Sequence, residues 1–158
     1  MYSGPAGPPV AFPPTLFFVI ALALALGLHD YHPLALVSAL FEPWRVPAGA
    51  GLTVAGIALF VWGVLTMTRA RTGVMFERPA VALILRGPYR WSRNPMYVAF
   101  VVGYVGLAAL FNSLWPLLIL PAPLVLVGSL VIAREEQYLR TKFGAAYDAY
   151  CRSVRRWL

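Results

Sequence analysis

The chain has 158 residues, of which 60% are hydrophobic and 12% are charged, and its formal net charge is +7. Ordinary soluble domains are roughly 25% charged, so this composition predicts a membrane protein and excludes a freely soluble monomer. The length allows a single domain, residues 1–158, but no separate soluble catalytic domain, so any catalysis must be built on the membrane helices.

The first half of the chain contains two predicted membrane helices, which together occupy residues 14–68. A tail rich in Pro and Gly, residues 1–13, precedes the first apolar segment, about Pro14–Leu28, which is short for a crossing. A cleaved signal peptide is the competing interpretation, but no basic residue precedes the segment, so we expect a retained helix. The second segment, Val46–Thr68, is long enough to cross. Four of its glycines suit close helix packing: Gly49, Gly51, Gly56 and Gly63.

The next two apolar segments form a predicted hairpin. About Met96–Phe111 and Leu114–Ala133 flank the polar pair Asn112-Ser113, and residues 94–133 carry no charge. Forty such residues are enough to cross a bilayer and return, at ~20 residues per crossing. The polar sequences on either side of the hairpin should therefore meet at one membrane surface. Three prolines should bend or delay the last helix: Pro116, Pro121 and Pro123.

The basic residues predict the orientation of the helices. Six arginines lie between the second and third segments, six basic residues follow the fourth, and only Arg45 lies between the first two. Lys and Arg collect on the cytoplasmic side, so we expect four crossings with both termini in the cytoplasm. Anionic lipid headgroups then account for the positive charge, and no nucleic-acid partner is expected.

The C-terminal sequence predicts an amphipathic helix at the cytoplasmic surface. Apolar residues recur at spacings of three and four along Leu139–Trp157, and charged residues occupy the other faces. Such a helix can lie on the bilayer. The alternative is that its aromatic residues, which include Tyr147 and Tyr150, close over a bound ligand.

Two polar sequences flank the hairpin, Gly87–Tyr97 and Arg134–Glu136. Each alone is typical of an anchor at the membrane surface. Their order resembles the signature of the isoprenylcysteine carboxyl methyltransferase family, which is related to the phospholipid N-methyltransferases. The resemblance covers residues 69–158 and is more specific for the superfamily than for the substrate. It is carried by Gly-Pro-Tyr-Arg from Gly87, Arg-Asn-Pro-Met-Tyr from Arg93, Glu135-Glu136, and Phe143-Gly144 followed by Tyr147, Tyr150, Val154 and Arg156-Trp157.

The resemblance implies an integral-membrane methyltransferase that uses S-adenosylmethionine. Arg93 or Arg90 can bind the carboxylate of this cofactor, and Glu135 and Glu136 can accept hydrogen bonds from its ribose or its ammonium group. Aromatic faces for the adenine or the sulfonium come from Tyr89, Tyr97, Tyr147 and Tyr150. Asn94 and Pro95 complete the expected cofactor site, and the expected catalytic residues are Arg93, Asn94 and Glu136.

The expected substrate is lipophilic or amphipathic and enters from the bilayer, which makes membrane lipids the expected surroundings and partners. We expect carboxyl methylation of a prenylcysteine-like compound. The family often has histidine where this chain has Asn94, and asparagine cannot act as a general base. A carboxylate is already ionised and needs only alignment, whereas an amine must first lose a proton. A phospholipid or another lipophilic amine or thiol stays the alternative acceptor.

Two other classes of protein stay open, and no metal site is expected. A sterol-reductase-like enzyme would use NADPH, but the chain is small for that class. A non-catalytic assembly protein would bind neither cofactor. His29-Asp30-Tyr31-His32 has two possible metal ligands three residues apart, but no further ligand cluster accompanies them. The oligomeric state is open.

Overall fold

The computed structural model describes residues 13–37, 42–70 and 82–158, and the regular secondary structure in these ranges is entirely helical. The predicted all-α fold is therefore confirmed for the described chain. The predicted tail, apart from Pro13, and the basic residues Arg71 and Arg78 lie outside the described ranges. The elements are α1 (Thr15–Tyr31), α2 (Glu42–Arg69), the 3-10 helix η2 (Gly87–Arg90), α3 (Pro95–Leu110), α4 (Trp115–Ile119), α5 (Pro121–Val127), the π-helix η3 (Gly128–Ile132), α6 (Ala133–Phe143) and α7 (Ala145–Ser153).

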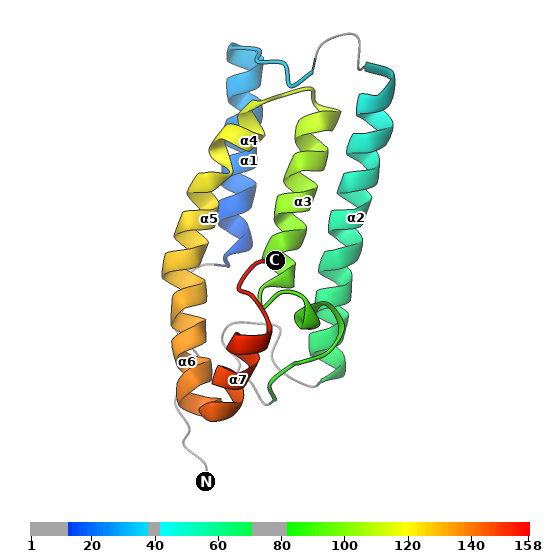
Figure 1. Ribbon diagram of the computed structural model, residues 1–158. Coiled ribbons are helices and arrows are strands. Elements are labelled where there is room, and N and C mark those ends of the chain that lie inside the picture. The colour runs from blue at the N-terminus through cyan, green and yellow to red at the C-terminus, as the bar shows by residue number, and fades with distance from the viewer. Residues whose placement is uncertain (1–12, 38–41, 71–81) are drawn as a thin grey trace.

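The helices form an elongated bundle in which α4, α5, η3 and α6 follow one another as a single column (Figure 1). This column, Trp115–Phe143, and α2 are long and apolar enough to cross a membrane. The 17 residues of α1 and the 16 of α3 are apolar but shorter than the ~20 residues of a usual crossing. Exposed large apolar side chains occur on α1, α2 and α5, as expected for surfaces that face lipid. The described residues thus form an all-helical bundle with two helices that could span a membrane, and four complete crossings stay a prediction.

Glycines on one face of α2 allow it to pack closely along α3. Gly49, Gly56 and Gly63 are buried and recur every seven residues. A Cβ atom at Gly56 would lie 2.8 Å from the backbone nitrogen of Gly103 in α3, which cannot move aside as a flexible side chain can. The predicted packing role is confirmed for these three glycines. It is wrong for Gly51, because a Cβ atom there would meet nothing within 4 Å.

Phe18 joins α1 to the rest of the bundle. Its ring is fully buried and stacks on Phe100 of α3, with 4.8 Å between the ring centroids. The hydroxyl of Tyr104 also donates a hydrogen bond to the Phe18 carbonyl oxygen. The same apolar cluster includes Val127 and Val131 from the column Trp115–Phe143. This core lies between α1, α3 and the column. Among the described long helices, α2 packs closely on α3 only.

The turn between α3 and α4 is fixed by polar contacts with the first half of the chain. Asn112 has a positive φ of 48°, and its Oδ1 accepts hydrogen bonds from the backbone of Leu36 (3.1 Å) and Val37 (3.0 Å). Arg45 donates to the last carbonyl oxygens of α3, which have no partner within the helix. Arg45 thereby stabilises the helix end that carries a partial negative charge.

Prolines and a π-helix shape the column Trp115–Phe143. Leu120, just before Pro121, separates α4 from α5 but keeps helical dihedral angles, so the bend expected from the prolines stays a prediction. The π-helix η3 follows α5 and leads directly into α6. Because a π-helix changes the rotation between successive residues, η3 sets the face of the column on which Glu135 and Glu136 lie.

The predicted C-terminal amphipathic helix is not a single helix. Gly144 adopts a positive φ of 49° and separates α6, the last helix of the column, from the short helix α7. The chain then becomes extended at Val154, and Trp157 packs against the bundle core. The helical spacing continues in the sequence, but hydrogen bonds to the loop before α3 hold the last residues in an extended form.

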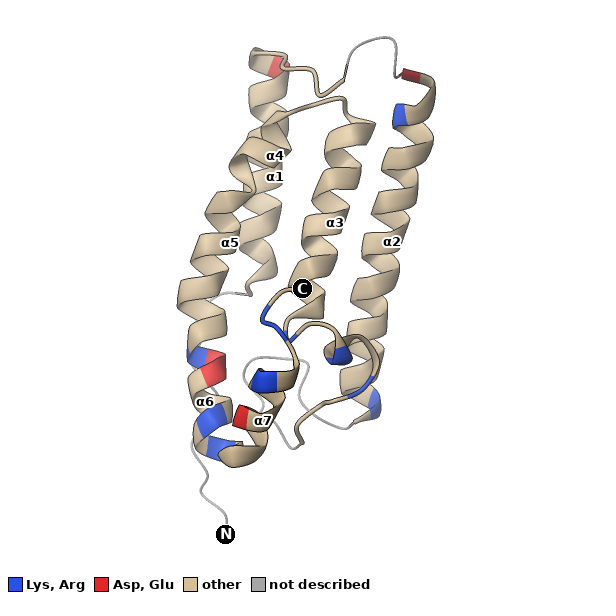
Figure 2. Cartoon of the chain, viewed as in Figure 1, with Lys and Arg blue, Asp and Glu red and all other residues tan. Residues whose placement is uncertain are grey.

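Charge is unevenly distributed along the bundle. Figure 2 shows basic residues gathered at the end where η2, α6 and α7 lie. Arg45 is at the opposite end, beside the C-terminus of α3. The described residues therefore have the charge asymmetry that the sequence predicted, and the two polar sequences that flank the hairpin do lie at one end of the bundle. Which side of the membrane this end faces stays a prediction.

Candidate functional site

The loop before α3 is positioned by glycine and proline. Gly87 has a positive φ of 58°, and a Cβ atom there would lie 2.8 Å from the Thr66 hydroxyl, so this turn packs closely on α2 only with glycine. Pro88 and Pro95 stand in the first turns of η2 and α3, where the fixed φ of proline favours a helix start. The loop between them, residues 91–94, is thereby held at the basic end of the bundle.

The last residues of the chain lie against this loop. We call residues 154–158 the C-terminal strap. Its backbone accepts three hydrogen bonds from the loop: Arg93 N to Arg155 O (3.0 Å), Ser92 Oγ to Arg156 O (3.3 Å) and Asn94 Nδ2 to Arg156 O (3.0 Å). Asn94 is buried, and its side-chain amide is committed to holding the strap.

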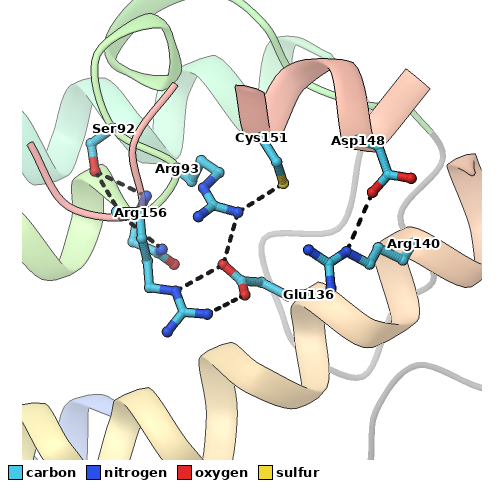
Figure 3. Close-up of polar contacts among 8 residues, drawn as sticks. Ser92, Arg93, Glu136, Arg140, Asp148, Cys151 and Arg156 are labelled. Carbon is cyan, nitrogen blue, oxygen red and sulfur yellow. Dashed lines mark hydrogen bonds and ion pairs between the residues drawn. The ribbon is translucent and has the colours of Figure 1, made fainter. Parts of the chain in front are cut away.

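Glu136 lies between two arginines, as Figure 3 shows. Arg93 Nη1 is 3.1 Å from Oε1 of Glu136. Arg156 from the strap binds both oxygens, with Nε 3.1 Å from Oε1 and Nη2 2.5 Å from Oε2. The side chains of Glu136 and Arg93 are 11% and 14% exposed, whereas that of Arg156 is 44% exposed. Glu136 is therefore a buried, fully paired carboxylate, and the hydrogen bond it accepts raises the pKa of Arg156 further.

A thiol completes the surroundings of Arg93. Its Nη1 also donates to Sγ of Cys151 in α7, at 2.8 Å (Figure 3). The neighbouring Arg140–Asp148 ion pair is exposed and 3.4 Å long, so it contributes little. The guanidinium of Arg93 thus joins three parts of the chain: its own loop, α6 and α7.

Three buried polar atoms at this end have no hydrogen-bond partner among the described residues: Arg93 Nε, the Tyr89 hydroxyl and the Tyr97 hydroxyl. Burial, and then the negative charge of Glu135, raise the pKa of Tyr89 above its ordinary value. Its hydroxyl is therefore protonated at neutral pH and able to donate. Buried polar atoms are normally satisfied, so these three atoms point to a polar ligand.

Tyr147 and Tyr150 are buried in an apolar cluster with Val154 of the strap. Their ring centroids are 6.2 Å apart. The Tyr150 hydroxyl donates to the carbonyl oxygen of Tyr89 at 2.7 Å, and burial raises the pKa of Tyr150 to about 12. Tyr150 thereby links α7 to η2.

The structure brings together most of the predicted site residues. Arg93, Asn94 and Glu136 are in one hydrogen-bonded cluster, and Tyr89 is within electrostatic range of Glu135. Pro95 is buried at the start of α3, and Tyr97 is buried in the bundle core, where its hydroxyl has no hydrogen-bond partner among the described residues. Arg90 is exposed at the end of η2 and contributes to none of the contacts described above.

The prediction missed Arg156, Ser92 and Cys151. Arg156 had a signal, because it lies in the C-terminal motif of the resemblance. Ser92 also lies in a recognised polar sequence, but its bond to the strap depends on a contact between residues 64 positions apart. Cys151 carried no signal, since a single cysteine has no spacing pattern to recognise.

Fold and site together define a helical membrane protein with a buried, partly unsatisfied polar cluster at its basic end. The sequence model of one family, phospholipid methyltransferase, matches residues 44–146, from the first turn of α2 to the start of α7. The chain belongs to the phospholipid methyltransferase family. The match includes the loop before α3 and both glutamates, and it ends before the strap.

Two curated relatives align with parts of the chain. The nickel-cobalt-cadmium resistance protein NccN of Alcaligenes xylosoxydans xylosoxydans is 34% identical over 101 residues, which cover 60% of this chain and 47% of that protein. An uncharacterized protein of Haemophilus influenzae is 49% identical over 35 residues, or 22% of this chain and 56% of that protein. The chain spans about half the length of these relatives. No solved structure matches the chain.

Proposed function

We propose that the protein is an S-adenosylmethionine-dependent methyltransferase that acts on a lipophilic or amphipathic substrate at the membrane. Membership of the phospholipid methyltransferase family supports methyl transfer. The observation that carries the proposal is a set of buried donors on Arg93, Tyr89 and Tyr97 that have no partner in the described part of the chain. Beside them lies Glu135, which is in none of the described ion pairs.

These residues fit the polar groups of the cofactor. Arg93 Nε is a charged donor suited to the methionine carboxylate. Glu135 is half-buried and is in none of the described ion pairs, so it can accept from the ammonium or the ribose hydroxyls. The Tyr89 and Tyr97 hydroxyls can donate to either part of the ligand. Glu136 is already saturated by two arginines, so we assign it to positioning Arg93 rather than to direct contact.

The residues of the chain would contribute to catalysis by binding and orientation. When bound, S-adenosylmethionine supplies a methyl group activated by the adjacent sulfonium. Arg93 and Glu135 would hold the two charged ends of its methionine part, which fixes the direction of the methyl group. Asn94 would contribute indirectly, by closing the strap over the site through the carbonyl of Arg156. Alignment of this kind can supply much of the rate enhancement.

We propose that the acceptor is the carboxylate of a prenylcysteine-like compound. The side chain of Asn94 has no basic group and is bonded to the strap, so no proton acceptor stands at this position. A carboxylate acceptor needs none. The second candidate is the amine of a phospholipid, which membership of the phospholipid methyltransferase family favours. An amine would require another residue to take its proton.

We also propose that the site faces the cytoplasm and that the substrate enters sideways from the bilayer. The basic residues at the site end support this orientation. The exposed apolar surfaces of α1 and α2 support lipid on the sides of the bundle. Both termini would then be cytoplasmic in a four-crossing protein.

Methyl transfer with labelled cofactor tests the acceptor directly. The detergent-purified protein would be incubated with methyl-labelled S-adenosylmethionine and either a farnesylcysteine acid or phosphatidylethanolamine. A methyl ester releases labelled methanol in base, whereas an N-methyl group does not. We expect base-labile label in the farnesylcysteine sample. Base-stable label in phosphatidylethanolamine would instead support the second candidate, and no transfer to either or to a total lipid extract would contradict the proposed activity.

A further inference from the structure

Two exposed tryptophans lie against each other at the corner where η2 packs on α2. The ring centroids of Trp62 in α2 and Trp91, which directly follows η2, are 5.5 Å apart, and the two residues are 42% and 62% exposed. A Cβ atom at Gly87 would lie 3.3 Å from the indole nitrogen of Trp62, so the start of η2 fits against the same ring. Exposed tryptophans of membrane proteins gather at the level of the lipid headgroups. The pair therefore marks the expected bilayer surface at this corner.

Three exposed arginines surround the tryptophan pair. Arg69 ends α2, Arg86 directly precedes η2, and Arg90 ends η2. Gly87 packs on Thr66, one turn before Arg69, and this contact brings Arg86 and Arg69 to the same corner. Figure 2 shows basic residues at the end of α2, in the loop before η2 and in η2 itself. We call this set the basic corner: Trp62, Arg69, Arg86, Arg90 and Trp91.

The basic corner differs in its charge balance from the other elements at the same end of the bundle. Residues 43–70 and 82–94, which include the whole corner, contain no Asp or Glu. In contrast, α6, α7 and the strap carry acidic residues among their basic ones, and Arg140 and Arg156 pair with Asp148 and Glu136. Within the described part of the chain, the corner therefore joins uncompensated positive charge to exposed aromatic surface.

We propose that the basic corner binds the headgroup of an anionic phospholipid. Guanidinium groups bind phosphate oxygens through pairs of parallel hydrogen bonds, and the three arginines supply positive charge for one headgroup. The indole rings suit the boundary between headgroup and acyl chains, because each has an apolar body and a polar N–H group. Leu65 and Leu85, which are also exposed, extend the apolar part of this surface. A free phosphate ion would use the arginines alone, so the combination favours a lipid.

This binding surface is separate from the proposed cofactor site. The five residues of the basic corner take no part in the described ion pairs of Arg93 and Glu136. The proposal also gives a role to Arg90, which the structure leaves outside that polar cluster. Because η2 also carries the buried Tyr89, a lipid at the corner would help to hold the element that presents the Tyr89 hydroxyl.

Quenching of tryptophan fluorescence by brominated lipids tests the proposal. The whole chain would be placed in phosphatidylcholine vesicles that contain a small fraction of dibrominated phosphatidylglycerol or, in parallel, the same fraction of dibrominated phosphatidylcholine. Brominated acyl chains quench tryptophans that they contact, and the difference from Trp91→Phe gives the signal of Trp91. We expect stronger quenching of Trp91 by the anionic lipid. Equal quenching by the two lipids would overturn the proposal.

Arginine variants show whether the corner itself causes the preference. Arg86→Gln and Arg90→Gln should each reduce the preference of Trp91 for the brominated anionic lipid by up to roughly fivefold, the contribution of one cation near an anionic membrane surface. Arg152→Gln is the matched control, since Arg152 is exposed on α7 and its replacement changes the net charge equally. The control should stay within about twofold of wild type, because salt screens distant charges. An equal loss in all three variants would indicate general surface charge and would overturn the inference.

A soluble anion distinguishes a lipid from free phosphate as the occupant. Glycerol phosphate carries the phosphate of the headgroup but no acyl chains. At equal ionic strength it should relieve the quenching by brominated phosphatidylglycerol no more than chloride does, because the indole rings hold only the lipid. Stronger relief by glycerol phosphate would show that the corner takes the soluble anion, and this result would overturn the assignment to a lipid.

Discussion

Glu135 and Glu136 are adjacent in the sequence but have different surroundings. Glu136 is buried and paired with two arginines, while Glu135 is in none of the described ion pairs and acts electrostatically on Tyr89. The sequence predicted cofactor contacts for both. Both contacts stay predictions, and in the function proposed above Glu136 positions Arg93 while Glu135 contacts the cofactor.

The two glutamates can therefore be separated by substitution. Glu135→Gln should weaken S-adenosylhomocysteine binding by roughly tenfold or more, with little change in thermal stability, because it removes a carboxyl acceptor that has no ion-pair partner among the described residues. Glu136→Gln should lower the free energy of unfolding by about 3 kcal/mol, because two arginines lose their charged partner. Calorimetric titration and thermal unfolding in detergent measure the two effects. Equal behaviour of the variants in both assays would show that the roles are misassigned.

Tyr150 predicts a pH dependence of stability. Its pKa is raised from 10.0 to about 12, chiefly by burial. Because the pKa of Tyr150 is higher in the folded state than in the unfolded state, its protonated hydroxyl stabilises the fold at pH values below 10.0. This contribution is lost as the pH rises from 10.0 towards 12. Tyr150→Phe also leaves the Tyr89 carbonyl without its donor, at a cost of about 1 kcal/mol. Unfolding from pH 8 to 11.5 should show the advantage of wild type over Tyr150→Phe shrinking above about pH 10. A constant or growing advantage would contradict this account.

At the scale of elements, the contact between α2 and α3 depends on the absence of side chains. A Cβ atom at Gly56 would lie 2.8 and 2.9 Å from backbone atoms of α3, closer than real Cβ contacts allow. Seven-residue spacing of glycines keeps this face continuous along the helix. The contact also supports the site, since η2 packs on the same helix through Gly87.

Alanine at Gly56 should separate the two helices. Gly56→Ala is expected to destabilise the protein by about 1–3 kcal/mol, the usual cost of overpacking. The matched control is Gly51→Ala in the same helix, where the added methyl group meets nothing within 4 Å. Since alanine favours a helix over glycine by up to ~1 kcal/mol, the control should be neutral or stabilising. Thermal unfolding in one detergent compares them, and similar losses in both would argue against close packing at Gly56.

The hairpin was predictable, and the strap was not. Forty uncharged residues require two polar flanks to meet at one surface, and this depends only on chain length and hydropathy. The strap keeps helical apolar spacing in Tyr150, Val154 and Trp157, so periodicity predicted a continuing helix. Its extended form comes instead from hydrogen bonds to a loop about 60 residues earlier, which no local pattern records. The role of Arg156 was hidden for the same reason.

At the scale of the whole molecule, the charge asymmetry gives the bundle a direction. The basic end carries η2, α6, α7 and the strap, and the opposite end is joined by Arg45 and Asn112. Lys and Arg are retained on the cytoplasmic side of membranes. The site should therefore be supplied with a soluble cofactor from the cytoplasm and with a lipophilic substrate from the bilayer.

Reporter fusions test this direction. Green fluorescent protein fused after Leu158 should fluoresce in bacterial cells, and alkaline phosphatase at the same position should be inactive, because we expect the C-terminus in the cytoplasm. Phosphatase inserted in the turn after α3, beside Asn112, should show the opposite behaviour. An active phosphatase at the C-terminus would reverse the proposed orientation.

Titration of purified protein with S-adenosylhomocysteine tests the central claim most directly, with Arg93→Ala and Arg155→Ala measured beside wild type. We expect measurable binding by wild type and by Arg155→Ala, whose exposed side chain is outside the polar cluster. Arg93→Ala should lose binding, because it removes the charged donor at the centre of the site. No binding by wild type, or equal binding by all three proteins, would contradict the proposal that this cluster holds the cofactor.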